Sequence, residues 1–269
     1  MRTAAALAAA CALLVGPSAG ARNRGADGVF ESRTSSHFEL LQDVDIDRSG
    51  GVHGSVRFER EVLAVLEQGF DGLDQWLGLR PQQRLSVVVY DPGIFDASFA
   101  GLFRFPAAGF YRGLIRVRGD VAVTAALQRT LLHELVHAAF DAVAPSLRVP
   151  AWLNEGLAEW FEARASGQSR LGPGEWGTLV RAASAGSIPP LQALSASSFV
   201  RMGPSEAGLA YLYSRGLVDH VARRKGEREL RRVCREIVRT GDVARSFRRV
   251  TRATPDEHDA VFRRELLGD

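Results

Sequence analysis

Apolar side chains follow strand spacing in a few short stretches near the start of the chain and helical spacing in most of the remainder. Residues 58–77 place their apolar side chains on one helical face. Residues 84–90 are rich in β-branched side chains and lie between prolines, so they predict a strand. Residues 37–41 alternate in part and predict a first strand, and residues 94–102 predict a short helix. The first part of the chain is therefore expected to combine strands and helices.

The pattern becomes helical after residues 109–118, which predict one strand or a hairpin with alternation from 114 to 118. Loops are predicted at the Gly- and Pro-containing segments 172–174 and 188–190. Helices are predicted over residues 123–143, 151–165, 207–221, 229–238, 244–250 and 255–267. The predicted fold class is α+β, with a small N-terminal mixed sheet and helix, two central helices, and an all-helical C-terminal lobe.

The helix expected over 123–143 contains the sequence His133-Glu134-Leu-Val-His137. Residues four apart lie on one helical face, and their Cβ atoms are about 6 Å apart. His133 and His137 can therefore each direct a ring nitrogen at one cation. Glu134 is rotated by about 100° from His133, next to the metal but not a ligand, where a general base for metal-bound water belongs. A catalytic zinc site of two histidines also needs a carboxylate, which Glu155 can supply if the chain folds back.

The surroundings of the two histidines are apolar, which favours a metal site over chance. A histidine or glutamate buried in an apolar helix costs free energy unless it has a partner. The alternative is a pair of hydrogen-bonded core histidines, and Glu155 weighs against it. The apolar residues of this helix are Leu127, Leu131, Leu132, Leu135, Val136, Ala138, Ala139 and Phe140.

These two segments also carry a family resemblance. The His-Glu-Leu-Val-His sequence, followed by Trp152-Leu-Asn-Glu-Gly-Leu-Ala-Glu159, resembles the gluzincin zinc metallopeptidases, which include the thermolysin-like enzymes. It is most similar to the small bacterial peptidase MA-like branch, in which the first Glu of the second motif is the third zinc ligand and matches Glu155. The resemblance is strong over residues 120–165, weaker over 205–265 and faint before 120.

The resemblance implies roles for residues around the ligands. Glu159 stands where thermolysin-like sequences have an acid that supports a metal-bound histidine, although it is also compatible with a surface carboxylate. Asn154 is either a second orienting residue or part of the helix start. An edge strand before the zinc helix binds the substrate backbone in the family, and residues 111–117 would fill that role unless they are an ordinary strand.

A residue that stabilises the oxyanion is also expected from the resemblance. The family pattern Ala-Tyr-x-x-Ser matches residues 210–214, which makes Tyr211 the candidate. Tyr213 and His220 are its rivals, and an aromatic residue of a helix core is the alternative for each.

The start of the chain reads as an export signal. Residues 1–21 combine an early arginine, an apolar run and an Ala-x-Ala site at Ala19–Ala21, so cleavage is expected before Arg22. A lipid anchor on Cys11 is a weaker alternative. Residues 22–35 are expected to form a flexible leader. The metallopeptidase domain is then 36–269, divided into an α/β part (36–119), a zinc-helix part (120–183) and a helical lobe (184–269).

Cysteine content and charge exclude other classes of protein. Cleavage would leave Cys234 alone, on the apolar stripe of a helix, and so without an intrachain disulfide. The isoelectric point near 9.2 comes almost wholly from arginines interleaved with acids, which predicts a solvated face with helical ion pairs rather than nucleic-acid binding. No later apolar stretch is long enough for stable membrane insertion.

The sequence thus predicts an exported metallopeptidase that binds one Zn²⁺ through His133, His137 and Glu155 and hydrolyses a peptide or protein substrate. Glu134 is expected to be the general base. The alternative is a catalytically inactive zinc-binding or assembly protein of the cell envelope. Retention of Glu134 argues against it, because a purely structural site has no use for that residue. The oligomeric state is left open.

Overall fold

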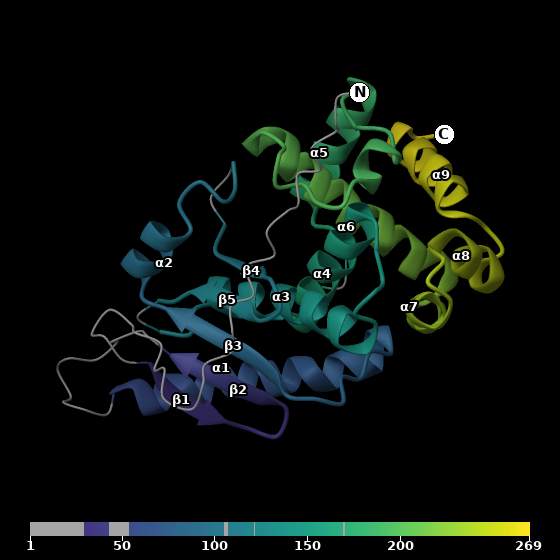
Figure 1. Ribbon diagram of the computed structural model, residues 1–269. Coiled ribbons are helices and arrows are strands. Elements are labelled where there is room, and N and C mark those ends of the chain that lie inside the picture. Colours follow the sequence, from purple (N-terminus) through teal and green to yellow (C-terminus); the bar gives the residue numbers. More distant parts are fainter. Residues whose placement is uncertain (1–29, 43–53, 105–106, 121, 169) are drawn as a thin grey trace, which may run out of the picture.

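The computed structural model describes residues 30–42, 54–104, 107–120, 122–168 and 170–269. A small sheet with one helix against it is followed by a succession of helices (Figure 1). This arrangement confirms the predicted α+β fold with a helical C-terminal lobe. The expected signal peptide over residues 1–21 lies outside the described residues.

The sheet is mixed and has the strand order β1-β2-β3-β5-β4. Its three inner strands are parallel, and each outer strand is antiparallel to its neighbour. The strands are β1 (Glu31–Thr34), β2 (Phe38–Gln42), β3 (Leu85–Tyr90), β4 (Gly109–Tyr111) and β5 (Ile115–Arg118). The segment predicted as one strand or a hairpin is therefore a hairpin, with Gly113 at φ 72° between β4 and β5.

The prediction of a flexible leader over 22–35 is wrong for its last part. Glu31–Thr34 form β1 and pair along their whole length with β2. Arg33 also forms an ion pair with the buried Glu59 of the first helix. An edge strand can be polar, because backbone hydrogen bonds to its neighbour hold it in place and solvent hydrates its side chains. Residues 22–29 lie outside the described residues.

The first helix, α1 (Gly54–Gly72), packs against the sheet through Val62, Leu66 and other buried side chains. A short π-helical turn, Leu73–Leu77, continues it as far as the predicted end. Gly78 stops this turn in the left-handed conformation, at φ 68°.

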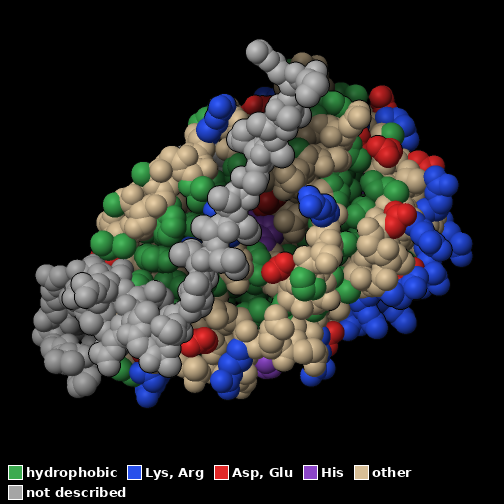
Figure 2. Space-filling view, viewed as in Figure 1, with side chains coloured by type: hydrophobic (Ala, Val, Ile, Leu, Met, Phe, Trp, Pro, Cys, Tyr) green, Lys and Arg blue, Asp and Glu red, His purple; other side chains and the backbone are tan. Residues whose placement is uncertain are grey.

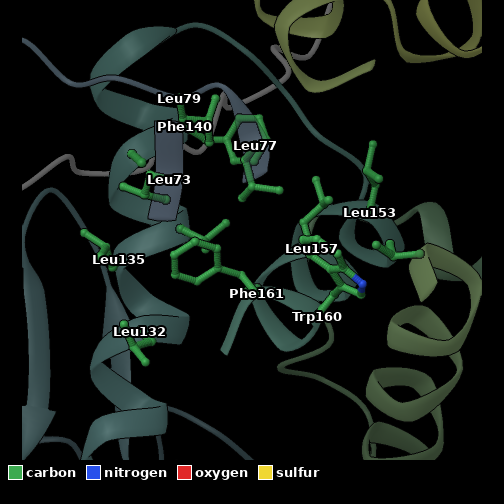
Figure 3. Close-up of a cluster of buried hydrophobic side chains, with 14 of the residues drawn as sticks. Leu73, Leu77, Leu79, Leu132, Leu135, Phe140, Leu153, Leu157, Trp160 and Phe161 are labelled. Atoms are coloured by element: carbon green, nitrogen blue, oxygen red, sulfur yellow. The ribbon is translucent and has the colours of Figure 1, made fainter. Parts of the chain in front are cut away.

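Two central helices carry the candidate ligands. Helix α3 (Ala125–Val143) begins after Thr124, whose hydroxyl accepts a hydrogen bond from the Leu127 N–H. Helix α4 (Ala151–Ala165) begins after Pro150. The two helices pack through buried side chains that include Leu132 and Leu135 of α3 and Phe161 of α4 (Figure 3).

A close approach between α4 and the long helix α6 (Pro204–Lys225) depends on Gly156. A Cβ atom at Gly156 would lie 2.6 Å from the backbone oxygen of Ser214, so a side chain cannot be accommodated without separating the helices. This contact sets α6 directly beside the helix that carries Glu155. It fixes where Tyr211, one turn before Ser214, can lie.

The remaining predicted helices are present, but the one predicted over residues 94–102 ends at Ser98, and one further helix is not predicted. Residues 172–174 were expected to form a loop, but they begin a helix. Pro173 occupies its first turn, and the Glu175 carboxylate accepts a hydrogen bond from the Gly172 N–H at 2.8 Å. These helices are α2 (Pro92–Ser98), α5 (Pro173–Ser184), α7 (Glu227–Thr240), α8 (Val243–Thr251) and α9 (Pro255–Leu267), with a short 3₁₀ turn at Ala193–Ser195.

Two further observations concern the described residues. No helix in the described ranges is long and apolar enough to cross a membrane. Cys234 is completely buried on α7, and burial raises the pKa of its thiol to about 12, as expected of a core cysteine.

Candidate metal centre

Helices α3 and α4 bring the three predicted ligands together. One nitrogen of His133, one nitrogen of His137 and one oxygen of Glu155 all lie within 4.8 Å of one another. Both histidines turn Nε2 toward the same carboxylate oxygen, at 3.2 Å for His133 and 3.3 Å for His137. Their rings are 5.0 Å apart and inclined at 76°. This group can hold a metal ion.

The three side chains are largely removed from solvent, with exposed fractions of 12 to 14 %. Burial alone would raise the pKa of Glu155, but the charge of His137 and the hydrogen bond with His133 outweigh burial and lower that pKa strongly. Burial opposes protonation of both histidines, yet contacts with carboxylates raise the pKa of His133 and of His137. Without a metal, the site therefore attracts protons onto its histidines. A cation with two positive charges would replace those protons.

Glu134 lies beside the three convergent donors but is not one of them. It is 6 % exposed. Burial is the main cause that raises its pKa, and the charge of Glu155 acts in the same direction. A buried carboxylate with a raised pKa is a better proton acceptor than an exposed one, which suits a general base.

His133 has two carboxylates behind it. Its Nδ1 lies 3.7 Å from Oε1 of Glu159 and 3.7 Å from Oε2 of Glu162. The support expected from Glu159 is thus matched by a contact, whereas Glu162 was not predicted. The available signal was spacing, because Glu162 follows Glu155 by two helical turns and lies on the same face of α4.

His137 is held differently. Its Nδ1 is buried and has no hydrogen-bond partner within the described part of the chain. Asn154 lines the same cavity but does not form a hydrogen bond with that nitrogen. The orienting role expected of Asn154 therefore stays a prediction.

Tyr211 reaches the site from α6. Its ring centre is 6.3 Å from that of His133 and packs edge-on against Phe199. Burial, followed by the charges of Glu155 and Glu134, raises the pKa of the Tyr211 hydroxyl, which stays a hydrogen-bond donor at neutral pH.

The two rivals of Tyr211 lie away from the site. The Tyr213 hydroxyl donates a hydrogen bond of 2.6 Å to Asp259 of α9. His220 is fully buried, with Nδ1 2.6 Å from Glu265. Tyr213 and His220 therefore face the core of the lobe rather than the metal group, and Tyr211 stays the candidate.

A cavity of about 770 Å³ opens onto the candidate ligands. Figure 2 shows a hollow near the centre of this face, with histidine and acidic side chains at its floor. Among the lining residues are His133, Glu134, His137, Asn154, Glu155 and Tyr211, together with segments 109–112, 147–150 and 195–198. The cavity thus lies between the sheet, the two central helices and the start of the helical lobe.

The edge strand beside this cavity is shorter than predicted. Of these two strands only β4 lies at an edge of the sheet, because β5 lies between β3 and β4. The expectation of an edge over 111–117 is therefore wrong for residues 115–117. β4 is tied to α3 by a hydrogen bond of 2.6 Å from the Tyr111 hydroxyl to Asp141, one turn beyond His137.

No family model matches this chain, and no curated protein matches it. The interpretation of the site rests on its geometry and on its chemistry.

Proposed function

We propose that the protein is a zinc-dependent metallopeptidase. The observation that carries the proposal is the convergence of His133, His137 and Glu155 on one point of a cavity that Glu134 also lines. Two imidazoles and one carboxylate are a common ligand set of catalytic zinc, and they leave a position for water. When bound, zinc supplies a Lewis acid that polarises a carbonyl and lowers the pKa of a coordinated water.

Glu134 is the residue that transfers the proton in this proposal. It lies next to the ligands, and its raised pKa lets it accept a proton from the attacking water and pass it to the nitrogen of the leaving amine. The burial of Glu134 keeps bulk water from competing for that proton. A structural metal site has no need for such a residue, which weighs against the inactive zinc-binding alternative.

Substrate alignment falls to the sheet edge and to Tyr211. The outer side of β4 borders the cavity, and an extended peptide can add to such an edge through backbone hydrogen bonds. The Tyr211 hydroxyl is the candidate donor to the carbonyl oxygen as negative charge develops on it.

The test is hydrolysis of a quenched-fluorescence peptide library by the purified protein. We expect activity that a chelator removes and Zn²⁺ restores. Glu134→Gln should keep full zinc content and lose activity by about 10² to 10⁴-fold, the usual contribution of a general base. The control is Glu206→Gln, the same change at an exposed position of α6, which should hydrolyse like wild type. A Glu134→Gln variant as active as wild type would contradict the mechanism. A zinc-loaded wild type with no activity on any peptide would favour the binding-protein alternative.

Export through residues 1–21 is part of the proposal. The test is mass spectrometry of the N-terminus of protein recovered from the cell envelope or medium, and we expect it to begin at Arg22. A chain that keeps its first residues in the cytoplasm would contradict export.

A further inference from the structure

Positive charge is concentrated in one segment of the chain. Residues 223–252 contain twelve Arg and Lys against four Asp and Glu, a net charge of +8. The whole chain has a net charge of +3, so the rest of the chain has a net charge of −5. The excess of positive charge that makes the isoelectric point of the whole chain basic therefore comes from this segment.

This segment forms a continuous surface of the helical lobe. It spans the end of α6, all of α7 and α8, and the turns between them, and α7 packs against α8. Apolar side chains of both helices, including Leu230, Ile237 and Phe247, are buried, which leaves the charged side chains outside. Figure 2 shows Lys and Arg side chains crowded along the edge of the molecule where Figure 1 places α7, α8 and α9. We call residues 223–252 the basic surface.

The predicted ion pairs are present but leave many cations over. Arg239 pairs with Glu236 of the same helix at 2.6 Å, as predicted, and Arg231 pairs with Asp74 of the π-helical turn at 2.9 Å. Glu227 pairs with Arg164 of α4 instead of a residue of the basic surface. Seven exposed cations have no carboxylate within 4.0 Å in the described part of the chain: Arg224, Lys225, Arg228, Arg235, Arg245, Arg248 and Arg252.

We infer that the basic surface attaches the protein to anionic phospholipid headgroups. Arginine binds phosphate oxygens in a bidentate manner, and a plane of phosphates can meet cations spread over two helices. The only aromatic residue of the segment, Phe247, is buried, so the basic surface offers no ring on which nucleic-acid bases could stack. Its apolar side chains face the core, so attachment is electrostatic, without insertion.

Attachment in this way leaves the cavity accessible. The residues that line the cavity end at Tyr211 in chain order, and none belongs to α7, α8 or α9. A membrane against the basic surface would hold the protein by its helical lobe while the cavity opens elsewhere. Because these cations take no part in the metal site, the inference stands or falls separately from the proposed peptidase activity.

The experiment is co-sedimentation of the whole protein with vesicles of phosphatidylcholine that contain about one third phosphatidylglycerol. Vesicles of phosphatidylcholine alone serve as the reference. We expect binding to the anionic vesicles only, and a steep loss of binding as salt is raised. The variant Arg228→Gln/Arg245→Gln/Arg248→Gln should bind about 100-fold more weakly, because each cation near an anionic membrane contributes about 1 kcal/mol.

The matched control removes the same charge elsewhere. Arg60→Gln/Arg129→Gln/Arg201→Gln changes three exposed arginines outside the basic surface and should reduce binding by less than about threefold. Thermal unfolding of both variants should equal that of wild type. Equal losses in the two variants, or equal binding to both kinds of vesicle, would overturn the inference. Duplex DNA that displaces the protein from anionic vesicles at physiological salt would overturn it in favour of nucleic acid.

Discussion

The described part of the chain contains two pairs of neighbouring histidines that are largely removed from solvent, and one of these pairs forms a candidate metal site. The rings of His133 and His137 are 5.0 Å apart, and those of His220 and His258 are 6.2 Å apart. In the first pair, both Nε2 atoms approach one oxygen of Glu155 at the floor of a cavity.

In the second pair, the rings bind different partners. His220 Nδ1 lies 2.6 Å from Glu265, and His258 Nε2 lies 2.9 Å from the hydroxyl of Thr251. Phe262 packs against His220, in the core of the helical lobe. Burial and a nearby carboxylate are thus common to both pairs. Convergence of donor atoms on one accessible point distinguishes the metal site.

The two pairs of histidines also differ in the direction in which their pKa values are shifted. Burial disfavours the charged form of every one of these histidines. At the metal site, Glu155 and its acidic neighbours outweigh burial and raise the pKa of each ring. In the lobe burial prevails, so the pKa of His220 falls despite its hydrogen bond to Glu265. The first pair lies among carboxylates whose negative charge favours a bound cation. The second pair is a neutral part of the core.

The largest effect should come from removing the shared carboxylate. We predict that Glu155→Ala weakens zinc binding by more than about 100-fold, the upper range for residues that only support a ligand. The control in the other pair is His220→Asn, which should lower the free energy of unfolding by about 1 to 3 kcal/mol and leave zinc affinity unchanged. Competition with a fluorescent zinc chelator measures both affinities. Full zinc affinity in Glu155→Ala would require a different third ligand.

Two tyrosines on α6 extend the same contrast. Tyr211→Phe should reduce kcat by about 10² to 10³-fold, the range for loss of one oxyanion donor, with little change in stability. Tyr213→Phe should leave kcat near wild type. It should lower the free energy of unfolding by about 1 to 3 kcal/mol, because the buried Asp259 would lose a hydrogen bond. Peptide kinetics and urea unfolding of both variants separate the roles, and a reversal of the two effects would contradict the assignment.

The carboxylates behind His133 provide a smaller effect. Since Glu159 and Glu162 both lie 3.7 Å from the same nitrogen, either can orient the ring when the other is changed. We predict that each single Glu→Gln variant lowers zinc affinity by less than about threefold and that the double variant lowers it by about 10 to 100-fold, more than the product of the two single losses. Glu265→Gln, the corresponding change behind His220, should have no effect on zinc affinity. Additive losses would show that the two carboxylates act independently.

The second pair should respond to pH. Burial, followed by the charges of His220 and Lys225, lowers the pKa of His258 from 6.5 to about 4, against an opposite effect of Glu257. The unfolded chain therefore binds more protons than the native protein between these values. The stability that neutral His258 provides is fully present above pH 6.5 and declines as the pH falls toward about 4, by up to about 3 kcal/mol.

Urea unfolding at several pH values tests this prediction. As the pH falls from 6.5 to about 4, the unfolding free energy of wild type should decrease more than that of His258→Gln. A pH-independent difference would show that His258 keeps an ordinary pKa in the native protein.

The candidate metal ligands could be predicted from the sequence because their arrangement is local. His133 and His137 are one turn apart in a helix whose apolar pattern is strong, and Glu155 opens the next helix. Spacing places Glu162 on the same face of α4 as Glu155, but its contact with His133 could not be predicted, since that distance depends on how α3 crosses α4. For the same reason, the sequence could not predict that Tyr211 faces the site, since its position depends on the contact of α6 with Gly156.

The errors in the fold have equally local causes. Gly172 and Pro173 are typical of loops, but they also suit the start of a helix. The hydrogen bond that the Gly172 N–H donates to the Glu175 carboxylate favours the helix α5. Residues 31–34 have little apolar content, and the strand forms because β2 offers it a free edge. Strand order is not encoded locally either, so β4 rather than β5 became the edge beside the cavity.

The most direct test of the metal site is the zinc content of the purified wild-type protein, measured by elemental mass spectrometry after reconstitution at neutral pH and removal of free metal. We predict about one zinc per chain. A protein that retains no zinc under these conditions would contradict the proposal, and His133, His137 and Glu155 would then be a buried ion-pair cluster.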